Sequence, residues 1–354
     1  MLETFEVPFP LGTYRILLGQ GLLASAGSII RDNGCGEPIA IVTNPLVDRL
    51  HGDTLRRGLD LAGYVHHTIT VPDGEDHKSL ASLAQLYDRF LDLGLDRGST
   101  VIALGGGVIG DLAGFAAATY MRGVPLVQVP TTLLAQVDAS IGGKVAVDLP
   151  RGKNLVGAFY PARLVLTDTA VLRTLPPSEV RAGLAEIVKA AAIRSESLFE
   201  LLEGEGIEAL DRAVREAVAI KVAVVTEDPF ERGVRAILNF GHTIGHGLET
   251  AAGYQLRHGD AVSVGMVAAA RIAAQIGTCD GSVPQRIEHL LALLQLPTQL
   301  AGPSSDDVWQ AMASDKKKRH GKLRYVLPVR IGEVVITDQV PEEVVRAVLE
   351  GVLC

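Results

Sequence analysis

Three histidines and one glutamate are the residues of this chain whose types and spacing most directly suggest chemistry. His242 and His246 are four residues apart in an expected helix, so they share one of its faces, and His258 opens the next expected helix. Glu186 lies in a mostly apolar helical stretch, where an unpaired charge would be costly. Such a set suits a divalent ion such as Zn²⁺ with one position open to substrate. For any single histidine, a hydrogen-bonded helix residue is the alternative interpretation.

A glycine-rich turn offers a second kind of chemistry. The expected strand 100–104 runs into Gly105-x-Gly107-x-x-Gly110, and an expected helix covers residues 112–120. This order and spacing match the dinucleotide fingerprint, in which glycines let the backbone approach a pyrophosphate at a helix N-terminus. The motif lies far into the chain, and no acidic residue follows at the usual distance. A turn that only allows the helix to pack on the sheet is therefore the alternative.

Cations recur in polar or glycine-rich settings and favour a small anionic ligand. They are Lys144, Lys153, Lys221, Arg235 and the basic run 316–319. A nucleic-acid partner is a poor interpretation, because only 5% of the residues are aromatic and no basic stripe accompanies the run. The formal net charge of −8, from 33 Lys and Arg against 41 Asp and Glu, likewise offers no bulk attraction for nucleic acid or an anionic membrane.

The cysteines and the apolar stretches indicate a compartment. Cys35, Cys279 and Cys354 are odd in number and far apart, so neither a disulfide framework nor a thiolate metal site is expected. The first residues lack the basic and apolar regions of a secretory signal, and the apolar stretches are too short to span a membrane. We therefore expect a cytoplasmic protein with no membrane partner.

The elements that must position these residues change type near the middle of the chain. Short aliphatic runs predict strands of a mostly parallel sheet at residues 14–18, 39–43, 65–71, 100–104, 126–129 and 164–167. After Pro176-Pro177, a 3.6-residue period predicts helices at 178–202, 211–227, 242–252, 259–276, 284–294 and 341–350, with a hairpin of strands 322–327 and 333–337. A chain of 354 residues exceeds the roughly 250 that one core usually supports. Two domains, 1–176 and 177–354, follow, with chemistry expected in a cleft between them.

Nearly the whole chain resembles the 3-dehydroquinate synthases, a family within the sugar phosphate cyclases. The matching stretches are 73–79, 105–111, 120–123, 130–144, 152–154, 183–189, 239–249 and 258–260. The resemblance implies an N-terminal Rossmann-like α/β domain that binds NAD and a mainly α-helical C-terminal domain that binds metal and substrate. It also implies an active site in the cleft between the two, and a homodimer.

The resemblance further assigns roles to single residues of this sequence. It implies that Glu186, His242 and His258 hold Zn²⁺ or Co²⁺, while His246 and Glu231 assist proton transfer with Lys189 as a third catalytic residue. The spacing argument alone would have placed His246 on the metal. The implied NAD contacts are Asn44, Asp73, Glu75, Lys78, Gly106, Gly107, Val108, Asp111, Thr131, Thr132, Lys153 and Thr174. The implied substrate contacts are Arg122, supplied across the dimer interface, and Asp138, Lys144, Asn154, Lys189, Lys221, Arg235, Asn239, Lys316 and Lys317.

The implied reaction is a phosphate-eliminating cyclisation, a carbon–oxygen lyase step of the shikimate pathway to chorismate and the aromatic amino acids. The substrate is a sugar acid phosphate, 3-deoxy-D-arabino-heptulosonate 7-phosphate. Transient oxidation by NAD, loss of phosphate, re-reduction and an intramolecular aldol closure give 3-dehydroquinate. The alternatives are a sibling cyclase that makes 2-epi-5-epi-valiolone or 2-deoxy-scyllo-inosose, a metal-dependent polyol dehydrogenase, and a non-catalytic NAD or metabolite sensor.

Overall fold

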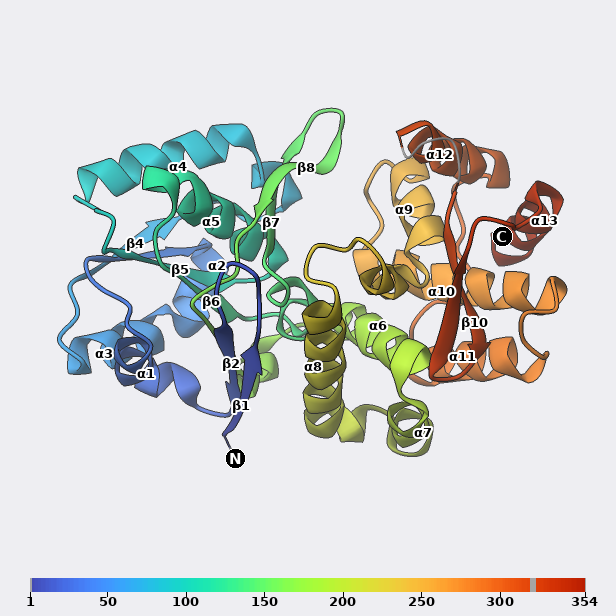
Figure 1. Ribbon diagram of the computed structural model, residues 1–354, viewed down its shortest axis with the longest axis horizontal. Coiled ribbons are helices and arrows are strands. Elements are labelled where there is room, and N and C mark those ends of the chain that lie inside the picture. The colour runs from blue at the N-terminus through green and yellow to red at the C-terminus, as the bar shows by residue number, and fades with distance from the viewer. Residues whose placement is uncertain (1, 319–322, 354) are drawn as a thin grey trace. The chain divides into compact units, whose positions relative to one another are not determined.

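The computed structural model describes residues 2–318 and 323–353, without the side chains of residues 315–318. The chain divides into two compact units, Met1–Pro176 and Pro177–Cys354 (Figure 1). A parallel sheet in the first unit and a mainly helical second unit confirm the fold class expected from the sequence. Within the described residues, no helix is both long enough and apolar enough to cross a membrane.

The first unit is built on a seven-stranded sheet. Its strands are β1 (Glu3–Val7), β2 (Tyr14–Gly19), β3 (Ile39–Thr43), β4 (His66–Thr70), β5 (Thr100–Gly105), β6 (Leu126–Pro130) and β9 (Leu164–Asp168). Their order across the sheet is β1-β2-β9-β6-β5-β3-β4. Only β1, which the sequence analysis did not predict, is antiparallel to its neighbour; every other pair in this sheet is parallel.

Helices cover both faces of this sheet (Figure 1). They are α1 (Ala26–Asp32), α2 (Pro45–Val47), α3 (Asp53–Leu61), α4 (Leu80–Asp92) and α5 (Gly107–Thr119). Side chains of α1 and α3, such as Ile30 and Leu55, share one core cluster with alternate residues of the sheet, such as Ile39 and Ile41. All residues of β3, β5, β6 and β9 are buried, as parallel strands covered on both faces require.

The connections of the parallel strands create a switch point between β3 and β5. The chain leaves β3 toward β4 on one side of the sheet, and it leaves β5 toward β6 on the other. In open parallel sheets, ligands bind beyond the carboxyl ends of the strands at such a point. The segments that begin at Asn44 and at Gly106 are therefore placed to form a binding site.

A hairpin between β6 and β9 was also not predicted. It consists of β7 (Lys144–Leu149) and β8 (Gly152–Phe159), which pair with an irregular register near the turn. The hairpin packs on α5, where a Cβ at Gly114 would lie 2.4 Å from Cγ1 of Val145. Glycine at position 114 is therefore needed for the close approach of this hairpin to the helix.

The second unit is mainly helical. Its elements are α6 (Pro177–Arg194), α7 (Glu196–Glu205), α8 (Leu210–Glu227), α9 (His242–Ala251), α10 (His258–Gln275), α11 (Ser282–Leu293), α12 (Ser305–Lys318), β10 (Tyr325–Arg330), β11 (Glu333–Thr337) and α13 (Glu342–Val352). Residues 182–193 of α6 are all buried, so this helix lies inside the unit rather than on its surface.

The structure differs from the expectations for this unit at three places. The single helix expected over 178–202 is broken at Ser195, whose hydroxyl accepts the backbone N–H of Leu198 and so caps a new helix, α7. The charged helix α12 was missed because its apolar residues do not form a clear stripe. The hairpin begins at Tyr325 rather than at Lys322, which lies outside the described residues.

Candidate functional site

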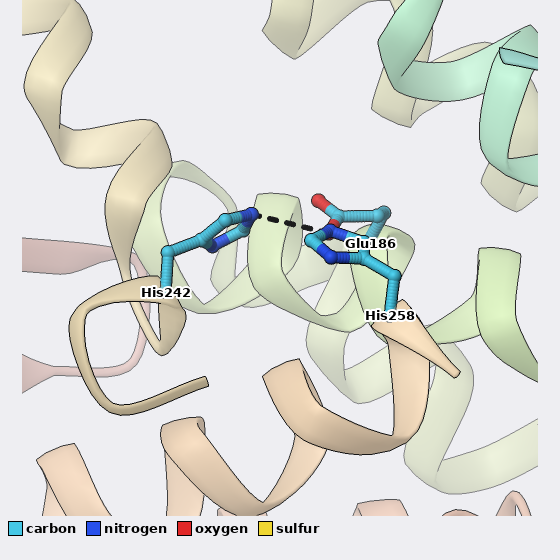
Figure 2. A group of neighbouring side chains, drawn as sticks. All are labelled: Glu186, His242 and His258. Carbon is cyan, nitrogen blue, oxygen red and sulfur yellow. Dashed lines mark ion pairs between the residues drawn. The ribbon is translucent and has the colours of Figure 1, made fainter. Parts of the chain in front are cut away.

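Three side chains from three helices of the second unit converge on one point (Figure 2). Glu186 comes from α6, and His242 and His258 are the first residues of α9 and α10. Oε1 of Glu186 lies 3.6 Å from Nε2 of His242 and 3.4 Å from Nε2 of His258. One ligand atom from each of the three residues lies within 4.8 Å of the other two. The carboxylate and the two imidazole nitrogens thus face a common centre.

Small residues allow the three helices to approach so closely. A Cβ at Gly259 would lie 2.3 Å from Cα of Ala182, one turn before Glu186 on α6. A Cβ at Gly265 would lie 2.0 Å from the backbone oxygen of Gly241, which precedes His242. No side chain fits at either contact, so the glycines let α10 rest directly on α6 and on the start of α9. This backbone contact places the two histidines beside Glu186.

The surroundings of His242 and His258 shift their pKa values in opposite directions. Burial lowers the pKa of His242 to about 3, and the nearby Lys189 ammonium acts in the same direction. Burial alone would also lower the pKa of His258, but hydrogen bonds to Glu186 and Glu249, with their negative charges, raise it to about 10. At neutral pH His242 therefore offers a free lone pair, while His258 holds a proton that a bound cation would replace.

The distances fit a divalent metal ion with tetrahedral preference. Ligand atoms about 2.0–2.1 Å from a tetrahedral Zn²⁺ lie about 3.3 Å from one another. The two nitrogen-to-oxygen distances, 3.4 and 3.6 Å, come close to that value before any ion draws the ligands together. One carboxylate and two imidazoles leave a fourth position for substrate or water, as catalytic zinc sites do. The residues present thus fit the ion that the sequence suggested.

His246 and Lys189 lie beside this cluster. The exposed His246 ring lies 5.3 Å from the ring of His242 and 6.2 Å from that of His258, measured between centroids. It belongs with Glu249 and His258 to a second group whose ligand atoms also lie within 4.8 Å. The buried Lys189 ammonium forms an ion pair with Oε2 of Glu186, the other oxygen of the same carboxylate. His246 is thus not among the three residues that meet at Glu186.

A tight loop carries Glu231 and leads to two more of the candidate residues. Oε1 of Glu231 accepts a hydrogen bond of 2.9 Å from the side-chain amide of Asn239, and Glu231 itself has a φ of 56°. The Asp228 carboxylate accepts the backbone N–H groups of Arg232, Gly233 and Arg235. Although partial burial acts in the opposite direction, these donors hold the pKa of Asp228 below its ordinary value. An anionic Asp228 therefore shapes the loop that presents Glu231.

Lys221 on α8 and Arg235 are buried cations of the same unit. Lys221 is 8% exposed and Arg235 only 2% exposed. The Arg235 guanidinium donates to the backbone oxygen of Pro229 over 2.5 Å. A buried cation is stable only with hydrogen-bond acceptors or anionic groups beside it.

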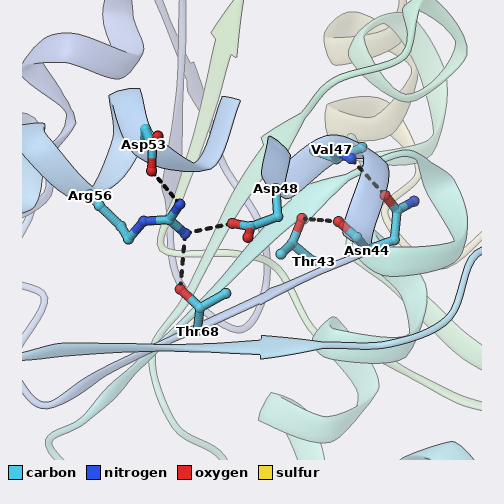
Figure 3. A network of polar contacts seen from close by, with 7 residues as sticks. All are labelled: Thr43, Asn44, Val47, Asp48, Asp53, Arg56 and Thr68. Atoms are coloured by element: carbon cyan, nitrogen blue, oxygen red, sulfur yellow. Dashed lines mark hydrogen bonds and ion pairs between the residues drawn. The ribbon is translucent and has the colours of Figure 1, made fainter. Parts of the chain in front are cut away.

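In the first unit, Asn44 stands immediately after β3 (Figure 3). Its side-chain oxygen accepts the backbone N–H of Val47 and caps the short helix α2. Its side-chain amide donates to Oδ1 of Asp73 over 2.9 Å, and Asp73 follows β4. Two candidate NAD contacts from neighbouring strands therefore lie side by side at the switch point.

Arg56 anchors the segment that follows Asn44. Its guanidinium donates to Asp48 over 2.5 Å, to Asp53 over 2.6 Å and to the hydroxyl of Thr68 on β4 over 3.2 Å (Figure 3). One planar cation thus joins the start of α3 to the preceding turn and to the sheet. This network supports the backbone on which Asn44 is presented.

The glycine turn begins α5 without a side-chain cap. Gly106 is the cap residue, and the helix starts at Gly107, so Gly107 and Val108 form its first turn. The expected helix start at residue 112 was too late. A small hollow at this point is lined by Gly105, Gly107, Asp111 and Ser140, among others. Uncapped backbone N–H groups next to a hollow are suited to a phosphate.

Thr131 and Thr132 follow β6 at the same edge of the sheet. The backbone N–H of Thr131 bonds to the oxygen of Gly105, which ties the ends of β5 and β6 together. A Cβ at Gly106 would lie 3.0 Å from Cγ2 of Thr132, so the glycine turn also packs against this threonine. The packing interpretation of the turn is thus confirmed, and its role as a ligand site stays a prediction.

Lys78 joins several of the predicted residues. Its ammonium lies 2.5 Å from Oδ2 of Asp111, 2.5 Å from the side-chain oxygen of Asn154 and 3.9 Å from Glu75. Burial raises the pKa of Asp111 to about 6, although the Lys78 charge opposes the increase. The structure thus brings together three predicted NAD contacts and Asn154, which was predicted to contact substrate.

The other predicted residues of the first unit lie at the ends of its elements. Thr174 receives a contact of 3.0 Å from His51, and Lys153 lies on β8. Arg122 is exposed and has a φ of 69°. Asp138 precedes the hairpin, and Lys144 opens β7. In the second unit, the backbones of Lys316 and Lys317 belong to α12, but their side chains lie outside the described part of the chain.

Some polar residues near these sites were not singled out from the sequence. Gln128, buried in β6, donates to the backbone oxygen of Gly110, and Asp168 accepts the N–H groups of Gly21, Leu23 and Ala170. Glu249 lies against His258. A polar residue inside an otherwise apolar strand was the available signal for Gln128.

Two family models match consecutive parts of the chain. The family model "3-dehydroquinate synthase N-terminal" matches residues 68–182, and "3-dehydroquinate synthase C-terminal" matches residues 183–318. The chain is 49% identical over 348 residues to the 3-dehydroquinate synthase of Symbiobacterium thermophilum, which covers 96% of this chain and 97% of the relative.

Two solved structures have a similar fold. The 2-epi-5-epi-valiolone synthase of Streptomyces hygroscopicus, solved with NAD⁺ and Zn²⁺ bound, has a TM-score of 0.89 and 29% identity over 98% of each chain. A 2-deoxy-scyllo-inosose synthase complexed with carbaglucose-6-phosphate, NAD⁺ and Co²⁺ has a TM-score of 0.89 and 28% identity over 99% of this chain and 100% of that chain. This chain belongs to the 3-dehydroquinate synthase family.

Proposed function

We propose that this chain converts 3-deoxy-D-arabino-heptulosonate 7-phosphate into 3-dehydroquinate and phosphate, with NAD and one divalent metal ion as cofactors. The observation that carries the proposal is the meeting of Glu186, His242 and His258 at one point. Relatives that share 44–49% of their residues with this chain over nearly full length carry the name of the same activity. The reaction is a phosphate-eliminating cyclisation, so the chain is a lyase of the shikimate pathway.

NAD would bind in the first unit, residues 1–176, beyond the carboxyl ends of the strands. The start of α5 at Gly106, Gly107 and Val108 would receive the pyrophosphate. Asn44, Asp73, Thr131 and Thr132 surround the same edge of the sheet, and Lys78 with Asp111 borders it. The remaining candidates for contact with the cofactor are Glu75, Lys153 and Thr174. The solved relatives that hold NAD⁺ support this location.

The metal would bind in the second unit, residues 177–354, to Glu186, His242 and His258. Zn²⁺ and Co²⁺ both accept nitrogen and oxygen ligands, and each occurs in one of the solved relatives. Bound NAD would accept hydride from the substrate and return it, and the bound ion would polarise the substrate oxygen that alternates between hydroxyl and carbonyl.

The side chains near the metal residues would bind substrate and move protons. Lys189, Lys221 and Arg235 are buried cations, suited to a substrate with a carboxylate and a phosphate. His246 is exposed beside the metal residues and would exchange protons with substrate, with Glu231 as a second proton carrier. The amide of Asn239 orients Glu231 through its hydrogen bond of 2.9 Å. The substrate roles of Arg122, Asp138, Lys144, Asn154, Lys316 and Lys317 stay predictions.

A homodimer and a cytoplasmic location belong to the same proposal. An exposed arginine with a left-handed backbone, Arg122, is the residue that would reach a partner subunit. The described free cysteines, Cys35 and Cys279, are compatible with a reducing compartment. Sedimentation of the active protein tests the dimer, since a fully active monomer would exclude the role of Arg122.

Phosphate release from the heptulosonate phosphate tests the proposed activity. We expect phosphate without net NADH, because the cofactor returns to its starting state, and we expect a chelator to stop release until Zn²⁺ or Co²⁺ is restored. Sedoheptulose 7-phosphate and glucose 6-phosphate are the parallel substrates, because the sibling cyclases act on substrates without the carboxylate. Preference for either of these, or net NADH with a polyol, would overturn the proposal.

A further inference from the structure

His258 lies between two carboxylates from different helices. Its Nε2 atom lies 3.4 Å from Oε1 of Glu186, and its Nδ1 atom lies 3.5 Å from Oε2 of Glu249. Glu249 is 5% exposed and stands on α9, near the end opposite His242. The two nitrogens of the ring therefore have different tasks: Nε2 faces the cluster of metal residues, and Nδ1 faces Glu249.

His242 shows the same division with a different partner. Its Nε2 atom faces Oε1 of Glu186 at 3.6 Å, and its Nδ1 atom lies 3.1 Å from the backbone oxygen of Phe240. With the Nδ1 proton donated to that oxygen, the lone pair of Nε2 is directed at the shared centre. Both histidines thus present Nε2 inward and turn Nδ1 toward an acceptor of the protein. Only His258 has an anionic acceptor.

We propose that Glu249 is a positioning residue of the metal site, a conclusion that rests on the metal-binding role proposed above for Glu186, His242 and His258. Its carboxylate accepts the Nδ1 proton of His258, fixes the tautomer in which Nε2 is free to bind metal, and makes that nitrogen a stronger donor. An outer acceptor of this kind typically changes metal affinity about 10–100-fold. Glu249 does not bind the ion itself.

A second metal site is the competing explanation. The ligand atoms of His246, Glu249 and His258 lie within 4.8 Å of one another, so these residues could be taken for a binding group of their own. An ion there would need the Nδ1 lone pair of His258 while Nε2 serves the first site, and the ring would have to lose both protons. Two dications on one ring would also repel each other strongly. The proposal therefore predicts one ion per chain.

Metal binding to the full chain tests the role of Glu249. The affinities of Zn²⁺ and Co²⁺ are measured by competition with a chromophoric chelator, together with the bound stoichiometry and the visible spectrum of the Co²⁺ form. Glu249→Gln keeps the shape and an acceptor oxygen but removes the charge, and we expect binding about 10-fold weaker. Glu249→Ala removes the acceptor as well, and we expect a loss of about 100-fold and a changed Co²⁺ spectrum. Both variants should still bind a single ion when it is supplied in excess.

Glu288→Gln is the matched control. Glu288 forms an ion pair of 2.6 Å with Arg271 in the same unit, so this variant also loses a partly buried carboxylate, but one without contact to the cluster. We expect unchanged metal affinity and an unchanged Co²⁺ spectrum. With saturating metal, Glu249→Gln should recover kcat to within a few-fold of wild type without a change in KM, because its carboxylate would act through His258.

Each outcome decides for or against the role of Glu249. Wild-type affinity and spectrum in both Glu249 variants would overturn the proposal, as would two ions in the wild type and one in Glu249→Ala. If Glu249→Ala fails to fold, Glu249→Gln gives the decision by itself. A wild-type chain that binds no divalent ion would instead refute the proposed function, so the two failures are distinguishable.

Discussion

The ammonium of Lys78 lies 2.5 Å from a carboxylate oxygen of Asp111 and is almost completely buried. Lys78 lies between β4 and α4, whereas Asp111 lies in the second turn of α5. The same ammonium bonds to Asn154 on β8. The Lys78 ammonium thus joins three segments that border the candidate NAD site.

Replacement of Lys78 tests how strongly this pair stabilises the first unit. Lys78→Met leaves the largely buried Asp111 carboxylate without its cation. Breaking a buried pair in this way usually costs about 3–5 kcal/mol. We expect a loss of that size in the free energy of unfolding, measured by urea titration.

The control is the exposed pair of Arg89 and Asp92 at the end of α4, whose charged atoms lie 3.7 Å apart. Arg89→Met should change the free energy of unfolding by less than about 0.5 kcal/mol. Equal effects of the two substitutions would show that the Lys78 pair contributes no more than a surface contact.

The raised pKa of Asp111 predicts a specific pH dependence. Its carboxyl has a pKa of about 6 in the folded chain against 3.8 ordinarily, so the folded state binds this proton more tightly than the unfolded state. The contribution of this group to stability therefore falls as pH rises from about 4 to about 6 and is constant above that range. As pH rises over this interval, the free energy of unfolding of Asp111→Asn should increase relative to that of the wild type by up to about 3 kcal/mol. Urea titrations at several pH values measure the difference; parallel pH profiles would contradict it.

The contact between α10 and α6 predicts the effect of a single methyl group. In Gly259→Ala the new Cβ would meet the backbone of Ala182 at 2.3 Å, so α10 must move away from α6 and carry His258 from Glu186. We expect a stability loss of about 1–3 kcal/mol and clearly weaker Zn²⁺ binding. Gly204→Ala is the control, because nothing lies within 4 Å of its Cβ position on α7. That variant should be as stable as wild type or slightly more so, with normal metal affinity.

Metal binding should release one proton at neutral pH. His258 carries a proton because its pKa is about 10, whereas His242 is neutral because its pKa is about 3. The apparent affinity for Zn²⁺ should then rise about tenfold per pH unit between about pH 6 and pH 8. Calorimetry in buffers of different ionisation enthalpy counts the released protons. Release of two protons would mean that both histidines are charged in the metal-free chain.

Glu186 should contribute more to metal binding than any residue outside the cluster. Glu186→Gln removes the carboxylate charge that faces both histidines. We expect Zn²⁺ affinity to fall by more than about 100-fold, which exceeds the loss caused by replacing a residue that only contacts a ligand. Phosphate release should fall with it at low metal concentration. The control, Glu179→Gln, changes a partly exposed glutamate on the same helix that pairs with Arg257 at 3.7 Å. Unchanged metal content in Glu186→Gln would show that the ligand assignment is wrong.

The local sequence pattern was sufficient to predict most of the strands and helices, but not all of them. The aliphatic runs located the strands β2, β3, β5, β6 and β9 to within a residue or two, because a buried parallel strand must be apolar on both faces. The hairpin of β7 and β8 was missed, since β8 has no buried residue and shows little alternation, and the pairing of the two strands is irregular. The break at Ser195 had a recognisable signal, a serine that can cap a helix, but the continuing apolar residues on both sides concealed it.

The sequence by itself determined which residues carry the chemistry and which family the chain resembles, because residue types and short spacings are properties of the chain alone. Only the tertiary structure decided how these residues are combined. Spacing on one helix favoured His242 with His246, but the close approach of α10 to α6 at Gly259 brings His258 and Glu186 to His242 instead. The contacts of Glu249 with His258 and of Lys78 with Asp111 join different elements. Such contacts depend on how backbones pack, which no local spacing specifies.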